Sequence, residues 1–360
     1  MILSTLTAEN FRNLEPEEHA FHPASNIIVG QNGQGKTNLL EAIYFLGTTK
    51  SFRTTRAASL FRFGASTLAV AGRVLRDGVE RTMRVALETG EIKRRLLMIN
   101  GERMPLPEYV KAFTVFAYSA DRLDVVRGTP DDRRRFLDRG IASINAAYLD
   151  DLSRYHRVLR QRNALLYEIG TGGAGVRSLD AWDEGFTSAA QSVQRARDAY
   201  KNELAEAFER IVAAHHYHVS GVRFEYRPNV ADLRALRKEE VRARISLAGP
   251  QRDHLDFTIE GRPAADVLSG GELKTIVLFL KFAKLELFRR RFDEAPLFVL
   301  DDIDAELDLR ILQKLLAGLP ASTQVFATSA KEAFLEALRA GPHRRLTLEN
   351  GRVTTSTEFV

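Results

Sequence analysis

Gly30-Gln31-Asn32-Gly33-Gln34-Gly35-Lys36-Thr37 matches the phosphate-binding loop pattern G-x-x-x-x-G-K-[ST] at every fixed position. An apolar run over residues 26–29 comes directly before this loop and is typical of a buried strand. Residues 38–46, after the loop, repeat apolar side chains at helical spacing. A strand, a glycine-rich loop and a helix in this order predict a site for a nucleoside triphosphate. The backbone N–H groups of the loop and the positive end of the helix would both face the phosphates.

Two side chains at the end of this loop have specific chemistry in such a site. Lys36 is expected to reach the β- and γ-phosphates, and Thr37 is expected to offer its hydroxyl to Mg²⁺. The predicted ATP-binding segment is the whole loop together with Asn38. The alternative is a chance glycine-rich turn, and the flanking strand and helix argue against it.

Length and composition set loose bounds on the class of protein. The chain has 360 residues, which favours two structural units, and 44% of them are hydrophobic, enough for a sizeable core. Cysteine is absent, which excludes disulfides and thiolate metal sites. The start of the chain lacks the basic region of a signal peptide, and no apolar stretch is long enough to span a membrane. We therefore expect a cytoplasmic protein, and the net charge of +5 weakly favours a polyanionic partner.

Turn signals and helical patterns divide the chain into three parts. Residues 1–130 are expected to form a lobe with the phosphate loop and an antiparallel sheet. The expected hairpin turns of that sheet are Asp77-Gly78, Thr89-Gly90 and Asn100-Gly101. Residues 131–245 are charged and helical in pattern, and the break at 170–175 predicts two antiparallel segments of about 40 residues each. Residues 246–360 return to alternating strands and helices, so the fold class is α/β with an inserted helical arm.

An apolar strand in the last part ends in two carboxylates, Asp301 and Asp302. In a parallel sheet, an acid at the C-terminal end of a strand lies where a ligand phosphate chain is bound. We expect Asp301, with Thr37, to hold the metal, and Asp302 to orient or polarise the attacking water. The expected catalytic residues are therefore Lys36, Asp301 and Asp302. Helix capping by the two acids is the alternative interpretation.

Basic residues are concentrated in the strand-rich part of the first lobe. Residues 50–103 contain twelve Lys or Arg against five Asp or Glu, whereas the helical part is nearly balanced. A twisted antiparallel sheet with arginines on one face could follow a DNA phosphate backbone without reading bases. A solvated outer face explains the same excess equally well, and both interpretations stay open. The residues assigned to DNA on the first interpretation are Arg53, Arg73, Arg76, Arg81 and Arg84.

Leu268-Ser269-Gly270-Gly271-Glu272 precedes a helical pattern that is expected from residue 275 onward. The backbone of such a turn, at the start of a helix, is a second anion-binding corner. One nucleotide does not need two corners in a single chain, but a head-to-tail dimer does. Ser269 and Gly271 of each copy would then close on the γ-phosphate held by Lys36 of the other copy. Here the chain resembles the ABC-type ATPases, whose signature is this string.

The spacing of the motifs narrows the resemblance. Lys36 and Ser269 are 233 residues apart (269 − 36), whereas transporter ATPases of the ABC class have much less chain between the two motifs. A chain with an insertion of this size resembles the DNA-repair branch of the ABC-type ATPases, which includes the SMC-type proteins and the RecF family. The arm of an SMC-type protein would be far longer than this insertion. The blocks that resemble the RecF family are Asn10-Phe11-Arg12-Asn13-Leu14, residues 30–43, Ser51-Phe52-Arg53-Thr54, residues 122–130, 133–138 and 249–255, and the acids at 301–302 with the D-loop-like Ala305-Glu306-Leu307-Asp308.

This resemblance implies an ABC-type ATPase head, with a mixed sheet carrying the phosphate loop, an antiparallel β subdomain and an inserted helical arm. It implies that Mg²⁺ and ATP join two heads into a homodimer that clamps double-stranded DNA at gaps. Weak, DNA-dependent ATP hydrolysis would release the clamp. RecR and RecO are the implied protein partners in recombinational repair. Arg12 and Asn13 would line the nucleotide pocket, or they could only finish a strand.

The sequence departs from the ABC pattern at two positions. Residues 118–121 contain no glutamine where a Q-loop is expected, and residues 325–329 contain no switch histidine. Two other function classes remain alternatives. An ATP-dependent nuclease with an ABC head would need an acidic cluster outside the ATPase motifs, and a transporter ATPase subunit is disfavoured by the motif spacing and the missing histidine. His215-His216-Tyr217-His218 is interpreted as a helix end rather than a metal site.

Overall fold

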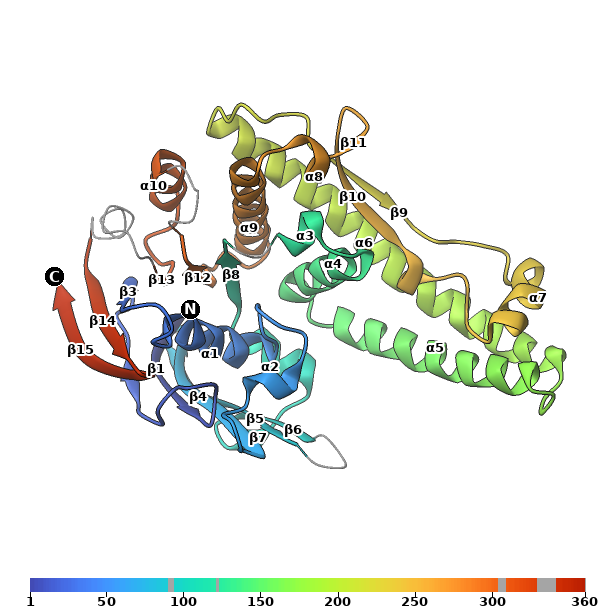
Figure 1. Cartoon of the computed structure of the whole chain (residues 1–360), viewed down its shortest axis with the longest axis horizontal. Helices are drawn as coiled ribbons and strands as arrows, with labels where there is room; N and C mark the ends of the chain where they lie inside the picture. The colour runs from blue at the N-terminus through green and yellow to red at the C-terminus, as the bar shows by residue number, and fades with distance from the viewer. Residues whose placement is uncertain (90–93, 121–122, 304–308, 329–340, 360) are drawn as a thin grey trace. The chain divides into compact units, whose positions relative to one another are not determined.

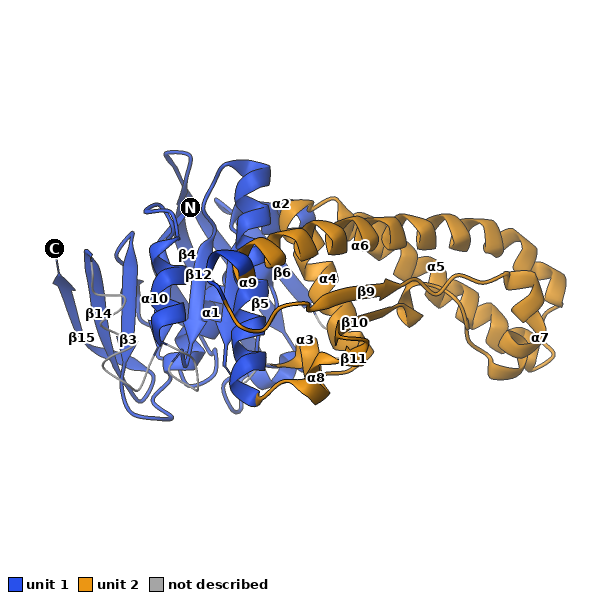
Figure 2. Cartoon of the chain, turned by 90° about the horizontal axis from the view of Figure 1, so that it is seen from above, with its two compact units in different colours: residues 1–122, 213–216, 270–360 blue, residues 123–212, 217–269 orange. Residues whose placement is uncertain are grey.

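A computed structural model covers the chain and describes residues 1–89, 94–120, 123–303, 309–328 and 341–359 (Figure 1). The chain divides into two compact units (Figure 2). Unit 1 contains residues 1–122, 213–216 and 270–360, and unit 2 contains residues 123–212 and 217–269. The expected arm at 131–245 therefore begins eight residues later and ends 24 residues earlier than unit 2 does. The D-loop-like string at 305–308 lies outside the described residues.

Unit 1 contains an antiparallel sheet of six described strands. In spatial order they are β2 (His19–Ala20), β1 (Ile2–Glu9), β4 (Thr67–Arg76), β5 (Val79–Glu88), β6 (Arg94–Ile99) and β7 (Glu102–Arg103). The predicted turns Asp77-Gly78 and Asn100-Gly101 are confirmed, because both residues of each turn have positive φ and join paired strands. The third expected turn, at Thr89-Gly90, falls partly outside the described residues.

A second sheet of unit 1 carries the phosphate loop. Its described strands are, in spatial order, β15 (Arg352–Phe359), β14 (His343–Glu349), β3 (Ser25–Val29), β13 (Val325–Thr328), β12 (Leu297–Asp301) and β8 (Val115–Ser119). All of these strands run parallel to their neighbours except β15, which pairs antiparallel with β14. The carboxyl ends of β3, β13, β12 and β8 therefore meet at one edge, with β13 between the loop strand and the acid-bearing strand.

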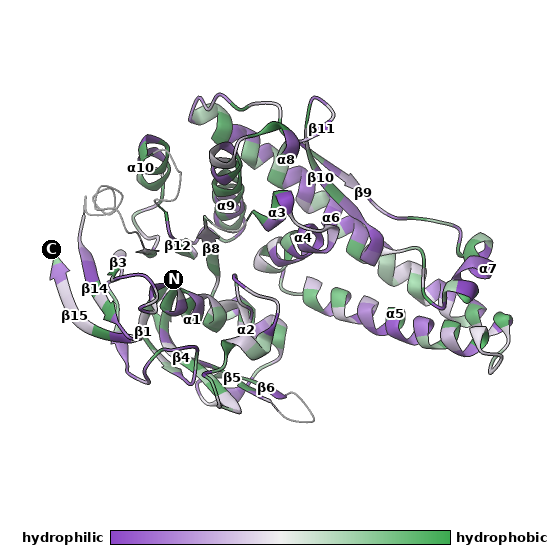
Figure 3. Ribbon diagram, in the orientation of Figure 1, coloured by the Kyte–Doolittle hydropathy of each residue, from purple (hydrophilic) through white to green (hydrophobic). Residues whose placement is uncertain are grey.

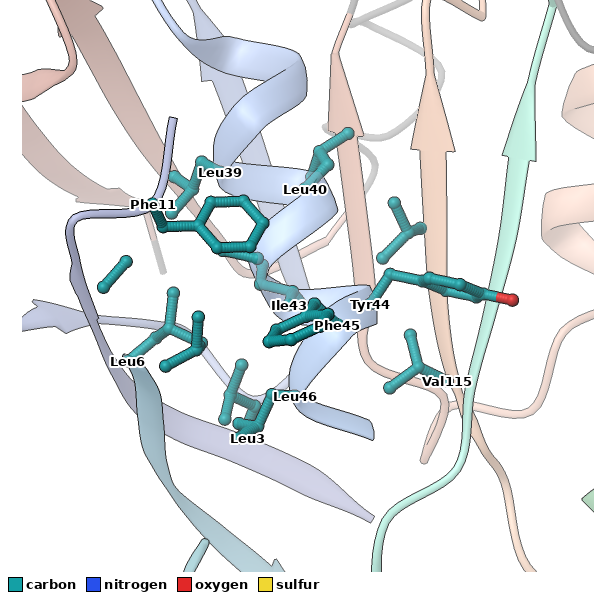
Figure 4. Close-up of a cluster of buried hydrophobic side chains, with 14 of the residues drawn as sticks. Leu3, Leu6, Phe11, Leu39, Leu40, Ile43, Tyr44, Phe45, Leu46 and Val115 are labelled. Carbon is teal, nitrogen blue, oxygen red and sulfur yellow. The ribbon is translucent and has the colours of Figure 1, made fainter. Parts of the chain in front are cut away.

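Helix α1 (Lys36–Thr48) lies in the core of unit 1 between these two sheets. Its apolar side chains pack on one side against Leu3 and Leu6 of β1, and on the other against Val115 of β8 (Figure 4). Residues 39–47 of α1 are all buried, which explains why the sequence shows an almost continuous apolar run there. The helix that follows the phosphate loop is thereby fixed on two sides. The remaining described helices of unit 1 are η1 (Ala57–Leu60), α2 (Leu106–Ala112), α9 (Gly270–Phe292) and α10 (Leu309–Ala317).

Helix α9 begins earlier than expected. The sequence predicts a helix from residue 275, and in the structure the helix starts at Gly270, so the two signature glycines form its first turn. Sequence periodicity detects the apolar body of a helix better than its glycine-containing start. Among the described helices, none combines the length and the hydropathy needed to cross a lipid bilayer.

Unit 2 is mainly helical. Its described elements are α3 (Asp124–Arg127), α4 (Pro130–Ile144), α5 (Tyr148–Gly170), η2 (Val176–Leu179), α6 (Asp180–Ala214, whose last two residues count with unit 1), β9 (Arg223–Arg227), α7 (Leu233–Ala243), η3 (Pro250–Arg252), β10 (His254–Ile259), β11 (Arg262–Pro263) and α8 (Ala264–Val267). Hydrophilic and hydrophobic residues alternate along α5 and α6 (Figure 3). The expectation of two helical segments is wrong for the first one, because the chain leaves helical geometry at Asn145 and divides it into α4 and α5.

Buried ion pairs hold the elements of unit 2 together. Arg197 of α6 contacts Asp138 of α4 at 2.9 Å and Asp253, directly before β10, at 2.9 Å. Arg162 of α5 is fully buried and contacts the equally buried Glu240 of α7 at 2.6 Å. Removing one partner of such a pair leaves a buried charge uncompensated, which is strongly destabilising. Part of the charge in the helical region therefore stabilises the fold of unit 2.

Candidate functional site

The phosphate loop has the backbone that its glycines predict. Gly30, Gly33 and Gly35 have φ values of 148°, 82° and 107°, a region that side chains other than glycine rarely adopt. Gly35 is the N-cap residue of α1, and no side chain caps this helix end. The first-turn N–H groups of α1 consequently point toward the loop, together with the positive end of the helix dipole. This arrangement suits a polyphosphate.

The loop lysine is buried and folded back on the loop. The Lys36 side chain donates from Nζ to the carbonyl oxygens of Gly30 at 2.7 Å and of Gln31 at 3.0 Å. A buried ammonium group needs such partners, because its desolvation is costly. The same geometry holds the charge beside the loop, where phosphate oxygens could replace a carbonyl partner.

The loop and the acid-bearing strand meet at Asp301. Thr37 donates from Oγ1 to Asp301 Oδ1 at 2.9 Å, although the two residues are 264 positions apart in sequence. Thr328, at the end of β13, donates to the same Asp301 oxygen at 3.0 Å. Ser119, at the end of β8, donates to Asp301 Oδ2 at 3.4 Å. The predicted metal pair is therefore brought together, and two hydroxyls that sequence reasoning did not assign join it.

Burial changes the acid–base behaviour of Asp301. Desolvation, and secondly the nearby charge of Asp302, raise the pKa of the Asp301 carboxyl from 3.8 to about 6, although hydrogen bonds from Thr37 and Thr328 act in the opposite direction. Oxygen ligands of this kind, one carboxylate and one hydroxyl, are what Mg²⁺ uses when substrate phosphates and water complete its shell. The residues present therefore fit the expected metal. A bound cation would favour the ionised carboxylate.

Asp302 takes an uncommon backbone conformation. Its φ is 49°, and its N–H donates to Thr328 Oγ1 at 2.9 Å. Because the hydroxyl of Thr328 bonds both acids, Thr328 fixes the direction of the chain where it leaves β12. Thr328 lies in the stretch, residues 325–329, in which the sequence lacks a switch histidine. The signal available in the sequence was only its place at the end of a short apolar run, in the stretch where a switch histidine was expected.

A buried acid on α1 holds two arginines beside the phosphate loop. Glu41 is fully buried and forms a bidentate ion pair with Arg12. Arg12 donates from Nε to Glu41 Oε2 at 2.9 Å and from Nη2 to Glu41 Oε1 at 3.1 Å. Arg53 lies 3.7 Å from the same carboxylate and donates to Asn38 at 2.8 Å, while the Ser51 hydroxyl also donates to Glu41. Sequence reasoning missed Glu41, since it reads as an ordinary helix residue. An acid inside an otherwise apolar helix was the available signal.

Asn13 contacts the same part of the site. Its side-chain oxygen accepts a bond from Asn38 Nδ2 at 2.7 Å, and it lies close to Gly35. Arg12 and Asn13 therefore stand beside the start of α1, as the pocket interpretation requires, and they follow β1 (Ile2–Glu9) rather than finishing it. Whether they contact a nucleotide stays a prediction.

The arginines assigned to DNA do not share one face of the antiparallel sheet. Arg81 pairs across the strands with Val74, which is buried in the core, and Arg76 is two positions from Val74 on the same strand, so both lie on the core-facing side. Arg73 and Arg84 lie on the opposite side. The expectation of a single arginine face is therefore wrong. The spacing of three between Arg73 and Arg76, and between Arg81 and Arg84, could have indicated this.

Arg73, Arg76 and Arg84 form ion pairs with acids of unit 1. Arg73 contacts Glu18 at 2.9 Å, Arg84 contacts Glu9 at 3.2 Å, and Arg76 contacts Glu294 at 2.8 Å. The side chains of Arg73 and Arg84 are 45% and 40% exposed, against 14% for Arg76. Surface pairs of this kind are weak and leave the exposed guanidinium groups available to a phosphate backbone.

Comparison with known proteins shows the family of the chain. A family model for the RecF/RecN/SMC N terminal domain matches residues 2–352. The DNA replication and repair protein RecF of Geotalea daltonii is 33% identical over 371 residues, covering 98% of this chain and 100% of that protein. The protein of the same name from Staphylococcus aureus (strain JH9) is 32% identical over 348 residues, covering 91% and 93%.

Solved structures with the same fold include RecF and Smc head domains. The recombination mediator protein RecF with ATP, of the RecFOR pathway, has a TM-score of 0.85 at 24% identity, covering 100% of this chain and 98% of that chain. An Smc head bound to the C-winged helix domain of ScpA has a TM-score of 0.56 at 16% identity, covering 100% and 98%. The predicted ABC-type ATPase head is thereby confirmed. The chain belongs to the RecF family of the SMC-like ABC-type ATPases.

Proposed function

We propose that this protein binds ATP with Mg²⁺ and hydrolyses it slowly, as the switch of a DNA-binding machine. The observation that carries the proposal is the 2.9 Å contact between Thr37 and Asp301, which joins the phosphate loop to the acid-bearing strand. Lys36 would bind the β- and γ-phosphates, Thr37 and Asp301 would hold the metal, and Asp302 would polarise the attacking water. An aspartate in this last role suits slow turnover.

ATP would also join two copies of the chain. Ser269 comes directly before α9, and Gly271 lies in the first turn of that helix. In a head-to-tail dimer their N–H groups would close on the γ-phosphate bound by the partner's phosphate loop. Each nucleotide would then be enclosed only in the dimer, so that ATP binding promotes assembly and hydrolysis releases it.

The partner of this dimer would be double-stranded DNA at gaps. Support comes from the family, whose curated relatives are named DNA replication and repair proteins, and from the exposed arginines of unit 1. Arg53, Arg73 and Arg84 are the exposed members of the assigned set, and their contacts would go to phosphates rather than to base edges. Partners equivalent to RecR and RecO would act with it in recombinational repair, in the cytoplasm. Family membership argues against the transporter alternative.

Sedimentation velocity tests the dimer and its DNA partner together. We expect a monomer without nucleotide, a dimer with Mg²⁺ and ATP, and a larger complex when duplex DNA is added to the dimer. Ser269→Arg should keep ATP binding but prevent dimer formation, because the long arginine side chain would block the approach of the partner's γ-phosphate to these N–H groups. Ser153→Arg, at an exposed position of α5, is the control and should dimerise normally. Normal dimer formation by Ser269→Arg would contradict the shared site.

A further inference from the structure

The C-terminal hairpin of unit 1 contacts the phosphate loop. Strand β14 runs parallel to β3, and the last pair in their register is Thr347 with Val29. Directly beyond this pair the two chains stay close. A Cβ atom on Gly30 would lie 2.4 Å from the carbonyl oxygen of Leu348, a distance that no real Cβ contact has. Gly30 is therefore required by the neighbouring strand as well as by its own φ of 148°.

The turn of this hairpin, Asn350-Gly351, holds the centre of the phosphate loop. The Gly351 N–H donates to the Gln34 carbonyl oxygen at 2.8 Å. The Asn350 N–H donates to Oε1 of the Gln34 side chain at 2.6 Å. Backbone and side chain of one loop residue are thus bonded by two consecutive amides that are more than 300 positions away in sequence.

The other side of the same turn contacts the segment that carries Arg12 and Asn13. The carbonyl oxygen of Gly351 accepts a bond from the Glu15 N–H at 2.9 Å. A Cβ atom on Gly351 would lie 1.9 Å from the Asn13 carbonyl oxygen, and one on Gly35 would lie 3.3 Å from Gly351 Cα. Gly351 is buried, unusually for a turn residue, because it fills the space between these two chains.

We propose that Asn350-Gly351 is a positioning element of the nucleotide site, which fixes the phosphate loop and the Arg12–Asn13 segment relative to each other. The proposal rests on the proposed ATP binding and adds to it residues far from every recognised motif. A loop held in its binding conformation before the ligand arrives loses less conformational entropy on binding. The two amide bonds to Gln34 supply this order. The site therefore depends on the last strands of the chain.

The chain contains a matched control for this turn. Asn100-Gly101 has φ values of 51° and 83°, against 50° and 80° for Asn350-Gly351, and it also joins two antiparallel strands. A Cβ atom on Gly101 would meet nothing within 4 Å. Gly101→Ala and Gly351→Ala therefore introduce the same backbone strain, but only Gly351→Ala displaces the chain around the phosphate loop.

Isothermal titration calorimetry with ATP and Mg²⁺ measures the effect on the full-length variants. Gly351→Ala should raise the Kd for ATP about tenfold, the effect expected when the two hydrogen bonds are weakened. Gly101→Ala should leave the Kd unchanged. Equal Kd values for the two variants would overturn the inference. If the wild-type protein bound no ATP, the proposed function itself would fail, and this outcome is distinguishable from the first.

A second variant covers the case in which Gly351→Ala does not fold. Gln34→Met removes the side-chain acceptor of the Asn350 amide while keeping the length of the side chain. It should raise the Kd for ATP by itself. In a double variant with Gly351→Ala the two effects should not add, because both act on the same contact. An unchanged Kd in Gln34→Met, or full additivity in a folded double variant, would also contradict the proposal.

Discussion

Replacing Asp301 with asparagine should stabilise the protein in the absence of Mg²⁺. Oδ1 of Asp301 accepts bonds from Thr37 and Thr328, and an asparagine oxygen can accept both of them. Oδ2 of Asp301 lies 3.4 Å from the Ser119 hydroxyl, which donates to it. In the variant the asparagine NH₂ would take the place of Oδ2, and the Ser119 hydroxyl could accept a hydrogen bond from it. The substitution therefore keeps the geometry and removes only the buried charge.

The magnitude follows from the raised pKa of Asp301. Its value rises from 3.8 to about 6 on folding, so the native state binds the proton more tightly than the unfolded state does. The wild-type protein consequently loses stability as the pH rises through the range from about 4 to 6. Above pH 6 the loss reaches about 3 kcal/mol, and Asp301→Asn avoids it. At pH 4.5 the advantage of the variant should fall to about 1 kcal/mol.

Thermal unfolding with a metal chelator at pH 8 and at pH 4.5 checks this prediction. At pH 8 the Tm of Asp301→Asn should be higher by about 4 to 7 °C, and at pH 4.5 by only a third of that. Addition of Mg²⁺ and ATP should stabilise the wild-type protein more than the variant, because the variant keeps the phosphate loop but lacks the carboxylate that would hold the metal. Asp150→Asn, at an exposed carboxylate, is the control. The reasoning is refuted if Asp301→Asn shows no gain at pH 8, or the same gain at both pH values.

Three further predictions concern the proposed cycle. Lys36→Met should weaken ATP binding by more than tenfold, on the order of the loss of one charge-assisted contact, as calorimetry would measure. Asp302→Asn should bind ATP and dimerise but release phosphate much more slowly and hold DNA longer; a normal rate in a phosphate-release assay would contradict the role of Asp302. Removing Arg73 and Arg84 together, as glutamines, takes four phosphate contacts from the dimer and should reduce the slope of log K for duplex DNA against log salt by about 4, while Arg262→Gln in unit 2 leaves it unchanged. If instead the Arg262 variant lowered the slope, the DNA surface would belong to unit 2.

The sequence alone predicted the parts of the site that are continuous in the chain. The phosphate loop needs glycines at fixed positions, a lysine and a threonine within eight residues, so its chemistry is written locally. The strand ending in Asp301 and Asp302 is recognisable for the same reason. The hairpin turns at 77–78 and 100–101 were predictable because only a few residue types accept their backbone angles.

The tertiary structure decided which distant residues meet at this site. Thr328 and Ser119 reach Asp301 because parallel strands bring their carboxyl ends to one edge, and no local pattern specifies which strands are neighbours. Glu41 acquires its role only when α1 is buried and Arg12 lies across it. The role of Gly351 also depends on its neighbours. Asn100-Gly101 and Asn350-Gly351 are the same pair of residues in sequence, but only the second turn lies beside the phosphate loop. Local sequence fixes the conformation of a segment, whereas its partners depend on the order of the strands in the sheet.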